Sequence, residues 1–398
     1  MQYIGLTNAN QEHKTSKSAA RGPIRILHVV GGMNRGGIET WLMHILRRID
    51  RDRFQMDFLV HTTQPCAYDE EIRALGSKII PCLYPSQPWM YADNFKRILR
   101  ESDPYDVVHS HVHHFSGYIL RLAQQAGVPV RIAHSHLDTS LIDAKAGLFR
   151  RLYLALTKYW IARYATHGLG CSRNALLALF NQDWDTDPRW RVLYCGIDLT
   201  PFKKRVDSVT VRAELGIPAD AFVVGHVGRF QEQKNHRFLL EIFAEVAKRE
   251  QQAYLLLVGE GPLRPNIEQQ ALQMRLGDRV IFAGGRSDVP RLMMAAMDVF
   301  LLPSLNEGLP MTGIEAQAAG LPLILSDIIT EEVNKIKPQV QKISSSQPAA
   351  VWADALLAAR NAKSNITQAN SLTVMKNSEF DITYSFQALI NTYSDEFH

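Results

Sequence analysis

Two glutamates stand eight residues apart in the segment NEGLPMTGIEAQAAGLP, which spans positions 306–322. Pro310 marks a turn and a helical pattern follows, so Glu307 precedes a predicted helix and Glu315 lies about one turn into it. The first N–H groups of a helix can hold an anion, and carboxylates can accept hydrogen bonds from paired sugar hydroxyls. The segment therefore predicts a nucleotide-sugar site. Compensation of the helix dipole, worth about 0.3–1 kcal/mol, would explain Glu315 but not Glu307.

A basic pair follows a predicted strand in the segment GHVGRFQEQKNH (225–236). Arg229 and Lys234 stand five residues apart in a polar turn that precedes a predicted helix. A guanidinium offers a bidentate fork and an ammonium offers a point charge, and a diphosphate suits both. Taken alone, the pair is better explained as ordinary charge in a solvated loop.

A glycine-rich turn follows the first predicted strand in GGMNRGGIETWLMHIL (31–46). Gly36 and Gly37 would let the backbone approach a ligand closely, and the helix that follows offers free N–H groups. The spacing is not G-x-G-x-x-G, so a phosphate contact is better supported than a dinucleotide site. A turn that binds no ligand fits the pattern equally well.

Six histidines occur in two short segments, HSHVHHFSG (109–117) and AHSH (133–136), and each segment follows a predicted strand. Alternate side chains of a strand point to opposite faces, which would divide the set, so we expect no metal site. We expect instead that one or two of them bond a sugar or phosphate oxygen in a cleft. The candidates are His109, His111, His134 and His136.

Apolar β-rich segments alternate with helical patterns along the whole chain, which indicates an α/β fold with parallel strands. A first series of predicted strands covers residues 25–30, 54–60, 77–83, 105–110, 129–134 and 167–172. A second series covers residues 222–228, 254–261, 279–285, 298–304 and 321–327. The repeat predicts two Rossmann-like halves, with ligands bound between them at the carboxyl ends of the strands.

The same pattern divides the chain into regions. Residues 1–22 are polar and lack the apolar segment of a signal peptide, so we expect a disordered tail there. We expect a first, acceptor-side domain over residues 23–198 and a second, nucleotide-sugar-binding domain over residues 199–377. The segment 378–398 predicts a helix that packs back on the first domain.

Composition excludes several classes of protein. No run of about 18 apolar residues occurs, so no membrane-spanning helix is expected. The net charge is +4, from +6 over residues 1–200 and −2 over residues 201–398, which is too small and dispersed for a nucleic-acid surface. It could favour an anionic membrane surface. Four scattered cysteines without a C-x-x-C motif indicate a reduced, cytoplasmic location: Cys66, Cys82, Cys171 and Cys195.

One predicted helix is amphipathic, in the segment GLFRRLYLALTKYWIARYA (147–165). Its apolar residues at helical spacing are Leu148, Leu152, Leu156 and Tyr159. Such a helix could rest on the inner membrane leaflet and meet a lipid-linked acceptor. An ordinary helix buried against the first sheet is the favoured interpretation.

Five segments together resemble glycosyltransferase family four, retaining enzymes of the GT-B fold. They are most similar to bacterial members that build exopolysaccharide, capsule or cell-surface glycans. The segments are GGMNRGGIE, DVVHSHVHHFSG, GHVGRFQEQKN, LLLVGEGP and EGLPMTGIEAQAAGLP, in the order and spacing of the family. The resemblance runs from about residue 24 to residue 330, and the two glutamates are its most specific element. It implies two Rossmann-like domains facing each other across a donor and acceptor cleft.

The resemblance also implies roles for residues of the second half. Arg229 and Lys234 match the basic pair that stabilises the diphosphate leaving group. Glu307 matches the glutamate that contacts the transferred sugar, and Glu315 matches the one that holds the ribose. Gly308 and Leu309, next to Glu307, belong to the same donor-binding segment, and the base is expected to meet the backbone around Gly285 and Arg286.

In the first half, Gly36 and Gly37 match the loop near the phosphates. His111 is the best match to the histidine beside the reacting sugar, and His109 is the alternative register. The implied activity is retaining transfer of a hexose from a nucleoside diphosphate sugar, with uridine as the family expectation. The implied acceptor is a hydroxyl of a glycan, expected on a lipid carrier in surface polysaccharide synthesis.

The family generally needs no bound metal, so neither a cofactor nor a metal ion is expected. Nucleic acid is not an expected partner, and peripheral association with the inner face of the plasma membrane is compatible with the sequence. Two alternatives stay open: a nucleotide-sugar epimerase or phosphorylase-like enzyme of the same architecture, and a non-catalytic subunit that binds a nucleotide sugar.

Overall fold

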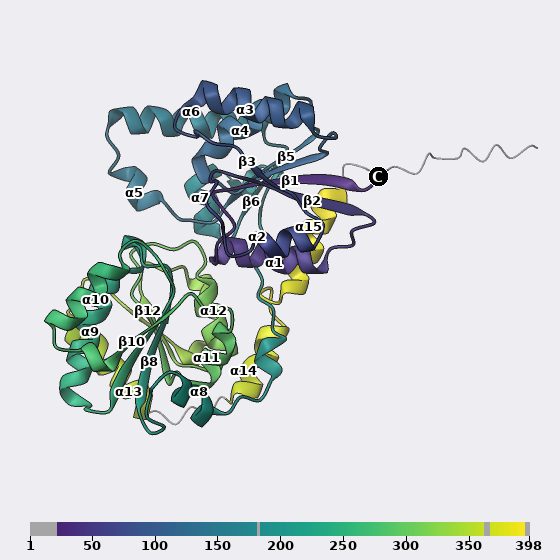
Figure 1. The fold of residues 1–398 in the computed structure, drawn as a ribbon. Helices are drawn as coiled ribbons and strands as arrows, with labels where there is room; N and C mark the ends of the chain where they lie inside the picture. Colours follow the sequence, from purple (N-terminus) through teal and green to yellow (C-terminus); the bar gives the residue numbers. More distant parts are fainter. Residues whose placement is uncertain (1–21, 181–183, 362–366, 395–398) are drawn as a thin grey trace, which may run out of the picture.

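A computed structural model of the chain describes residues 22–180, 184–361 and 367–394. The predicted tail over residues 1–22 lies outside the described residues, apart from Gly22. The described chain forms two parallel sheets of seven and six strands, and helices cover both faces of each sheet (Figure 1). This arrangement confirms the predicted α/β fold with two Rossmann-like halves.

The first sheet has the order β3-β2-β1-β4-β5-β6-β7. Its strands are β1 (Ile24–Val30), β2 (Phe54–Val60), β3 (Ile79–Pro81), β4 (Val107–Ser110), β5 (Val130–Ser135), β6 (His167–Gly170) and β7 (Trp190–Val192). The helices of this half are α1 (Gly37–Arg48), α2 (Asp69–Ala74), α3 (Pro88–Glu101), α4 (Ser116–Gln125), α5 (Ser140–Ala144), α6 (Leu148–Tyr164) and α7 (Arg173–Phe180). The strand order reverses between β1 and β4, and ligands bind at such a point in open α/β sheets.

The second sheet has the order β10-β9-β8-β11-β12-β13, with its reversal between β8 and β11. Its strands are β8 (Phe222–Val227), β9 (Ala253–Val258), β10 (Val280–Gly284), β11 (Val299–Leu302), β12 (Leu323–Ser326) and β13 (Val340–Ile343). Around it lie α8 (Ser208–Glu214), α9 (His236–Arg249), α10 (Arg264–Gln273), α11 (Val289–Ala295), α12 (Met311–Ala318), α13 (Ala349–Asn361) and α14 (Gln368–Lys376). The strand interiors are almost wholly apolar, as expected for a parallel sheet covered on both faces.

The last helix, α15 (Ile382–Ser394), returns to the first half and lies beside α1 (Figure 1). Trp41 of α1 donates a hydrogen bond from Nε1 to the Ser385 hydroxyl at 3.1 Å. Leu389 and Tyr393 are fully buried, and Leu389 belongs to the hydrophobic core that also contains Trp41. The helix begins at Ile382, four residues after the start of the predicted segment at residue 378.

Helix α6 is buried along one side, where Ile161 joins the core that covers the first sheet, but the buried side is not the apolar face expected from the sequence. It packs on α4 through Leu154, Thr157 and Ile161. The expected apolar face points to solvent, with exposed fractions of 70% for Leu148, 60% for Leu152, 45% for Leu156 and 62% for Tyr159. Helical spacing identifies an apolar face, but it does not say what covers that face. None of the helices in the described residues combines the length and the apolar character needed to cross a bilayer.

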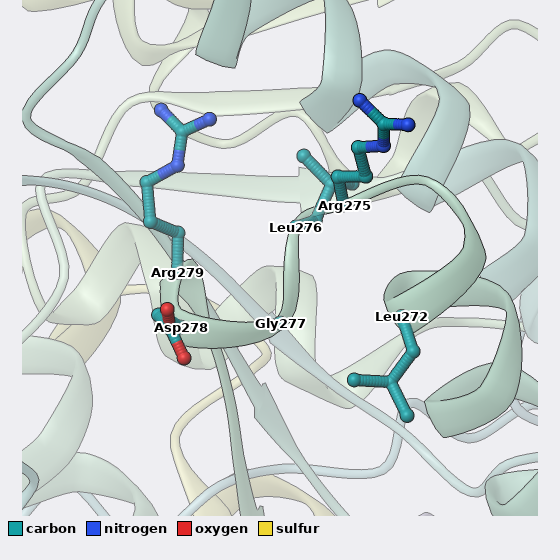
Figure 2. A pocket seen from close by; sticks show the side chains of 6 residues that line it. All are labelled: Leu272, Arg275, Leu276, Gly277, Asp278 and Arg279. Carbon is teal, nitrogen blue, oxygen red and sulfur yellow. The ribbon is translucent and has the colours of Figure 1, made fainter.

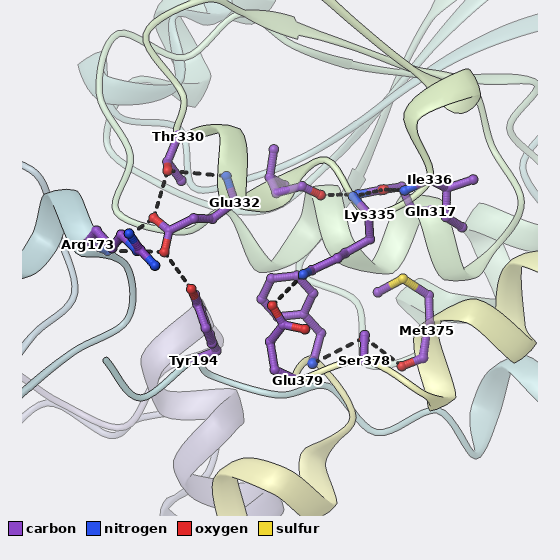
Figure 3. A network of polar contacts seen from close by, with 12 residues as sticks. Arg173, Tyr194, Gln317, Thr330, Glu332, Lys335, Ile336, Met375, Ser378 and Glu379 are labelled. Atoms are coloured by element: carbon purple, nitrogen blue, oxygen red, sulfur yellow. Dashed lines mark hydrogen bonds and ion pairs between the residues drawn. The ribbon is translucent and has the colours of Figure 1, made fainter. Parts of the chain in front are cut away.

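A carboxylate of the second half joins the two halves. Glu332 accepts hydrogen bonds from the backbone N–H of Arg173, at 3.1 Å, and from the Tyr194 hydroxyl, at 2.6 Å, both in the first half (Figure 3). The Thr330 hydroxyl donates to the same carboxylate at 2.8 Å. Lys335 forms an ion pair with Glu379 in the segment that leads into α15. Polar contacts as well as the returning helix therefore join the two halves.

If α15 holds the first half together, truncation of its buried face should destabilise the protein. Leu389→Ala is expected to lower the free energy of unfolding by about 2–5 kcal/mol, because it removes a fully buried side chain and leaves a cavity. Urea denaturation measures the change. Tyr384→Ala, on the exposed face of the same helix, is the matched control and should change stability little. Equal effects of the two variants would contradict the packing of α15.

Candidate active site

The loop between β11 and α12 carries Glu307, and the structure buries this side chain. Glu307 is only 8% exposed. Its Oε1 lies 2.5 Å from the Lys234 ammonium, and its Oε2 accepts a hydrogen bond from the Gln233 side chain at 3.2 Å. The predicted basic residue and the predicted glutamate thus meet, although 73 positions separate them. A buried carboxylate needs such a partner because an isolated charge is costly to desolvate.

Arg229 follows β8 and reaches across to the first half. Its Nη2 lies 2.9 Å from Glu39 Oε1 at the start of α1, and its Nε lies 3.5 Å from the Arg35 carbonyl oxygen. Gly36 makes this approach feasible, because a Cβ atom there would lie 2.3 Å from Arg229 Nη2. The predicted glycine turn and the predicted arginine are therefore in contact across the two halves.

The amino terminus of α12 offers unused hydrogen-bond donors. The Met311 and Thr312 N–H groups have no protein acceptor among the described residues, as expected for the first turn of a helix. The buried Thr312 hydroxyl also has no partner there. Gly37 lies opposite, where an added Cβ would come within 3.6 Å of the Met311 sulfur. These donors are suited to an anion that enters between the halves.

Glu315 lies on α12, one turn after these donors. Its side chain has no hydrogen-bond or ion-pair partner among the described residues, and burial raises the pKa of its carboxyl to about 7. A partly buried carboxylate without a protein partner can accept hydrogen bonds from ligand hydroxyls. Its position is compatible with the ribose-binding role that the family resemblance implies.

Gly308 and Leu309, in the loop that carries Glu307, lie where this loop contacts the first half. A Cβ at position 308 would lie 2.1 Å from the carbonyl oxygen of His136, so only glycine fits there. Leu309 is buried beside this contact. Arg286 follows β10, and its side chain forms a bidentate ion pair with Asp288 at 2.8 and 2.9 Å.

Five histidines of the first half lie together beneath the glutamate loop. His111, the expected neighbour of the sugar, has both ring nitrogens engaged, with His28 Nδ1 at 3.0 Å and His136 Nε2 at 2.9 Å. His109 contacts the Tyr393 hydroxyl at 2.8 Å and His134 Nδ1 at 3.2 Å. Burial lowers the pKa of His28 and of His136 to about 3, so these rings are neutral at pH 7.

The expected separation of the histidines by strand alternation is wrong for four of the six. Residues two apart on one strand end share a face, so His109 lies with His111 and His134 with His136. His113 and His114 lie elsewhere; His114 pairs with Asp143 at 2.9 Å. Sequence reasoning missed His28, inside an apolar strand, and Tyr393, on the last helix. Two groups of three histidines could each hold a metal ion: His28, His109 and His111, and His111, His134 and His136.

A surface hollow elsewhere in the second half is not the candidate site. It has a volume of about 520 Å³ and is lined by Leu272, Arg275, Leu276, Gly277, Asp278 and Arg279 (Figure 2). It lies at the turn after α10, and none of the predicted site residues lines it. The chemically suitable groups instead converge between the two halves.

The raised pKa of Glu315 predicts a pH-dependent stability. Its unfolded carboxyl titrates near pH 4.5 and its folded carboxyl near pH 7, so the folded protein binds more protons between these values and loses stability as pH rises through them. Glu315→Gln should therefore stabilise the protein above pH 7, by an amount on the order of 1–3 kcal/mol, and should have little effect at pH 4.5. Denaturation at pH 4.5 and pH 8 measures both values.

Glu241→Gln, on the exposed surface of α9, is the control and should show no such difference between the two pH values. An equal effect of Glu315→Gln at both pH values would contradict the burial of this carboxyl.

Comparison with known proteins assigns the two halves to described families. The family described as Glycosyltransferase Family 4 matches residues 35–201, and the family described as Glycosyl transferases group 1 matches residues 207–359. A putative glycosyltransferase EpsF from Bacillus subtilis (strain 168) is 41% identical over 337 residues, which cover 83% of this chain and 86% of the relative.

A more distant relative is the Escherichia coli UDP-Gal:alpha-D-GlcNAc-diphosphoundecaprenol alpha-1,3-galactosyltransferase, 32% identical over 240 residues, or 58% of this chain and 60% of the relative. The crystal structure of Anabaena Alr3699/HepE in complex with UDP-glucose has a TM-score of 0.77 at 19% identity and covers 93% of this chain and 99% of that chain. This likeness shows the fold alone. Together, the matched families, the 41% identical relative and the two facing sheets show that this chain belongs to the glycosyltransferases of the family-four type with the GT-B fold.

Proposed function

We propose that the protein is a retaining hexosyltransferase that moves a sugar from a UDP-sugar to a hydroxyl of a lipid-linked glycan in bacterial surface polysaccharide synthesis. The observation that carries this proposal is that two ion pairs, Arg229 with Glu39 and Lys234 with Glu307, and the free N–H groups of α12 lie at the carboxyl ends of the strands of the two halves. A nucleoside diphosphate sugar needs both sets of groups, because it joins an anion to paired hydroxyls.

Breaking the bond between sugar and phosphate places negative charge on the departing diphosphate. Arg229, Lys234 and the first N–H groups of α12 are held in place before that charge develops, so they can stabilise the transition state more than the ground state. Both cations are paired with carboxylates, Glu39 and Glu307. We infer that the diphosphate takes a share of these contacts when it binds.

Glu307 is better placed to orient the sugar than to attack it. Its two oxygens contact Lys234 and Gln233. It can therefore accept hydrogen bonds from sugar hydroxyls while the Lys234 ammonium compensates its negative charge. Retention is then attributed to attack of the acceptor on the face that the diphosphate leaves. This step uses the chain's own groups and the departing phosphate, and it requires no metal ion.

The choice of donor and acceptor rests on the relatives. HepE, which shares the fold, was crystallised with UDP-glucose, and the Escherichia coli relative is named for a UDP-linked donor and a diphosphoundecaprenol acceptor. We extend these two properties to this chain as part of the proposal. An epimerase of the same architecture would need no acceptor, and a non-catalytic subunit would show no turnover at all.

Lys234→Ala tests the donor site. The variant removes one charge-assisted contact, worth about 1.5–3 kcal/mol, so affinity for UDP should fall roughly 10- to 100-fold in titration calorimetry. Release of UDP in the presence of a glycan acceptor should fall at least as much. Lys248→Ala, an exposed lysine of α9 that pairs with Glu245, is the matched control. Unchanged UDP affinity in Lys234→Ala would overturn the proposed donor site, and preferred binding of GDP or ADP would overturn the choice of uridine.

The exposed face of α5 and α6 supports an acceptor carried in a membrane. Phe149, 88% exposed, extends the apolar residues of α6. Helix α6 contains four cations and no acidic residue: Arg150, Arg151, Lys158 and Arg163. An apolar face flanked by cations is typical of a helix that lies in the headgroup region of an anionic membrane. We propose that this face rests on the inner leaflet and brings the cleft to the lipid-linked acceptor.

Reversal of three of these charges tests the membrane contact. The triple variant Arg150→Glu, Arg151→Glu, Lys158→Glu should lose binding to vesicles that contain phosphatidylglycerol, because each basic residue contributes about 1 kcal/mol near an anionic surface. Co-sedimentation measures binding, and UDP titration should show the donor site unchanged. Lys248→Glu with Arg249→Glu, on α9 of the other half, is the control and should bind like the wild type. Absence of wild-type binding to such vesicles would refute the membrane contact.

A further inference from the structure

Three histidines at the carboxyl ends of β4 and β5 bring ring nitrogens close together. One nitrogen from each of His111, His134 and His136 lies within 4.8 Å of the others. His111 Nδ1 and His136 Nε2 are 2.9 Å apart. The Nε2 atom of His134 is buried and has no hydrogen-bond partner among the described residues. A buried polar atom without a partner is rare in folded proteins and calls for an explanation such as an unseen ion.

The other ring nitrogen of each histidine is already held by a different neighbour. The contacts are His111 Nε2 with His28 Nδ1 at 3.0 Å, His134 Nδ1 with His109 Nε2 at 3.2 Å, and His136 Nδ1 with Cys195 Sγ at 3.8 Å. Histidines that bind a metal commonly donate their second N–H group to an acceptor, usually a carboxylate, a carbonyl or water, which fixes the tautomer and the ring orientation; here the acceptors would be two imidazole nitrogens and a thiol sulfur. These contacts leave His111 Nδ1, His134 Nε2 and His136 Nε2 as the inward-facing atoms.

The hydrogen bonds behind these neighbours are consistent with the same proton arrangement. His109 Nδ1 lies 2.8 Å from the Tyr393 oxygen, and His28 Nε2 lies 3.5 Å from it. A phenolic oxygen has two lone pairs and can accept from both rings. His28 Nδ1 can then accept a hydrogen bond from His111 Nε2–H, and His109 Nε2 can accept one from His134 Nδ1–H. In one series of hydrogen bonds His111 donates to His28 and His28 donates to Tyr393; in the other His134 donates to His109 and His109 donates to Tyr393. This arrangement leaves lone pairs on His111 Nδ1 and His134 Nε2.

The alternative group of His28, His109 and His111 is less suited to an ion. Both ring nitrogens of His28 and of His109 already have hydrogen-bond partners. His28 contacts His111 and Tyr393, and His109 contacts His134 and Tyr393. No unpartnered nitrogen occurs on those three rings in the described chain. The group of His111, His134 and His136 is therefore the better ligand set.

We propose that His111, His134 and His136 bind a divalent cation of the zinc type. Imidazole ligands suit Zn²⁺, Co²⁺, Ni²⁺ and Cu²⁺, whereas Mg²⁺ and Ca²⁺ prefer oxygen ligands, and none of the three side chains supplies oxygen. Three protein ligands leave a fourth position open, as in zinc sites that exchange ligands. His136 is partly exposed, and its carbonyl oxygen faces Gly308, so the site lies beside the loop that carries Glu307.

The transfer step proposed above does not require this ion. The position of the ion predicts coupling to the donor site, because an ion that pulls the three rings together would shift the strand ends on which the glutamate loop rests. Zinc should therefore change the affinity for UDP, and UDP should change the affinity for zinc by the same factor.

The test uses the full chain without a polyhistidine tag, treated with a chelator and titrated with Co²⁺. We expect one equivalent to bind, with the intense visible absorption of four-coordinate Co²⁺, and one equivalent of Zn²⁺ to displace it. His134→Gln should weaken Co²⁺ binding at least about 100-fold, and His136→Gln provides a second ligand variant. His113→Gln is the matched control, since His113 contacts the Leu137 carbonyl oxygen outside the ligand set.

Circular dichroism and UDP titration of each variant show whether it folds and whether the donor site is intact. Absence of Co²⁺ binding by the wild type would overturn the proposal, and so would full binding by a folded His134→Gln variant. Loss of Co²⁺ binding together with retained UDP binding would support the metal site independently of the transfer reaction. Failure of the wild type to bind UDP would refute the proposed donor site without affecting the metal result.

Discussion

Charge pairing at the cleft is the constraint on which the site depends. Arg229 and Lys234 lie where a diphosphate is proposed to bind; the Arg229 side chain is 39% exposed, whereas Lys234 and Glu307 are largely buried. The chain supplies carboxylates in its absence, from Glu39 of the first half and Glu307 of the second. An unpaired buried charge would cost several kcal/mol. The paired groups remain in position, so binding the diphosphate requires an exchange of partners and little rearrangement.

The topology explains why these groups meet. Each half places its functional loops at the carboxyl ends of its strands, around the point where the strand order reverses. The glycine turn follows β1, Arg229 follows β8, and Glu307 follows β11. Glu332 (Figure 3) and α15 (Figure 1) then connect the halves. The halves therefore touch through contacts outside the site as well as through Arg229 with Glu39 and Gly308 with His136 inside it.

Much of this architecture could be predicted from local patterns, because central parallel strands are continuous apolar runs. The edge strands β7 and β13 were not predicted: both are short and partly exposed, so apolar runs do not mark them. The meeting of Lys234 with Glu307 followed from motif order. The pairing of Arg229 with Glu39 and the contact of His28 with Tyr393 did not, because they join residues 190 and 365 positions apart without any periodic signal. The exposed face of α6 shows the same limit, since the apolar pattern was predicted and its environment was not.

A crystal structure of the protein with bound UDP would test the account most directly. The account predicts that the diphosphate contacts Arg229, Lys234 and the N–H groups at the start of α12, and that the ribose hydroxyls donate to Glu315. It also predicts that the glutamate loop stays against His136. A nucleotide bound away from the two cations, or with its ribose distant from Glu315, would contradict the central claim that these paired groups form the donor site.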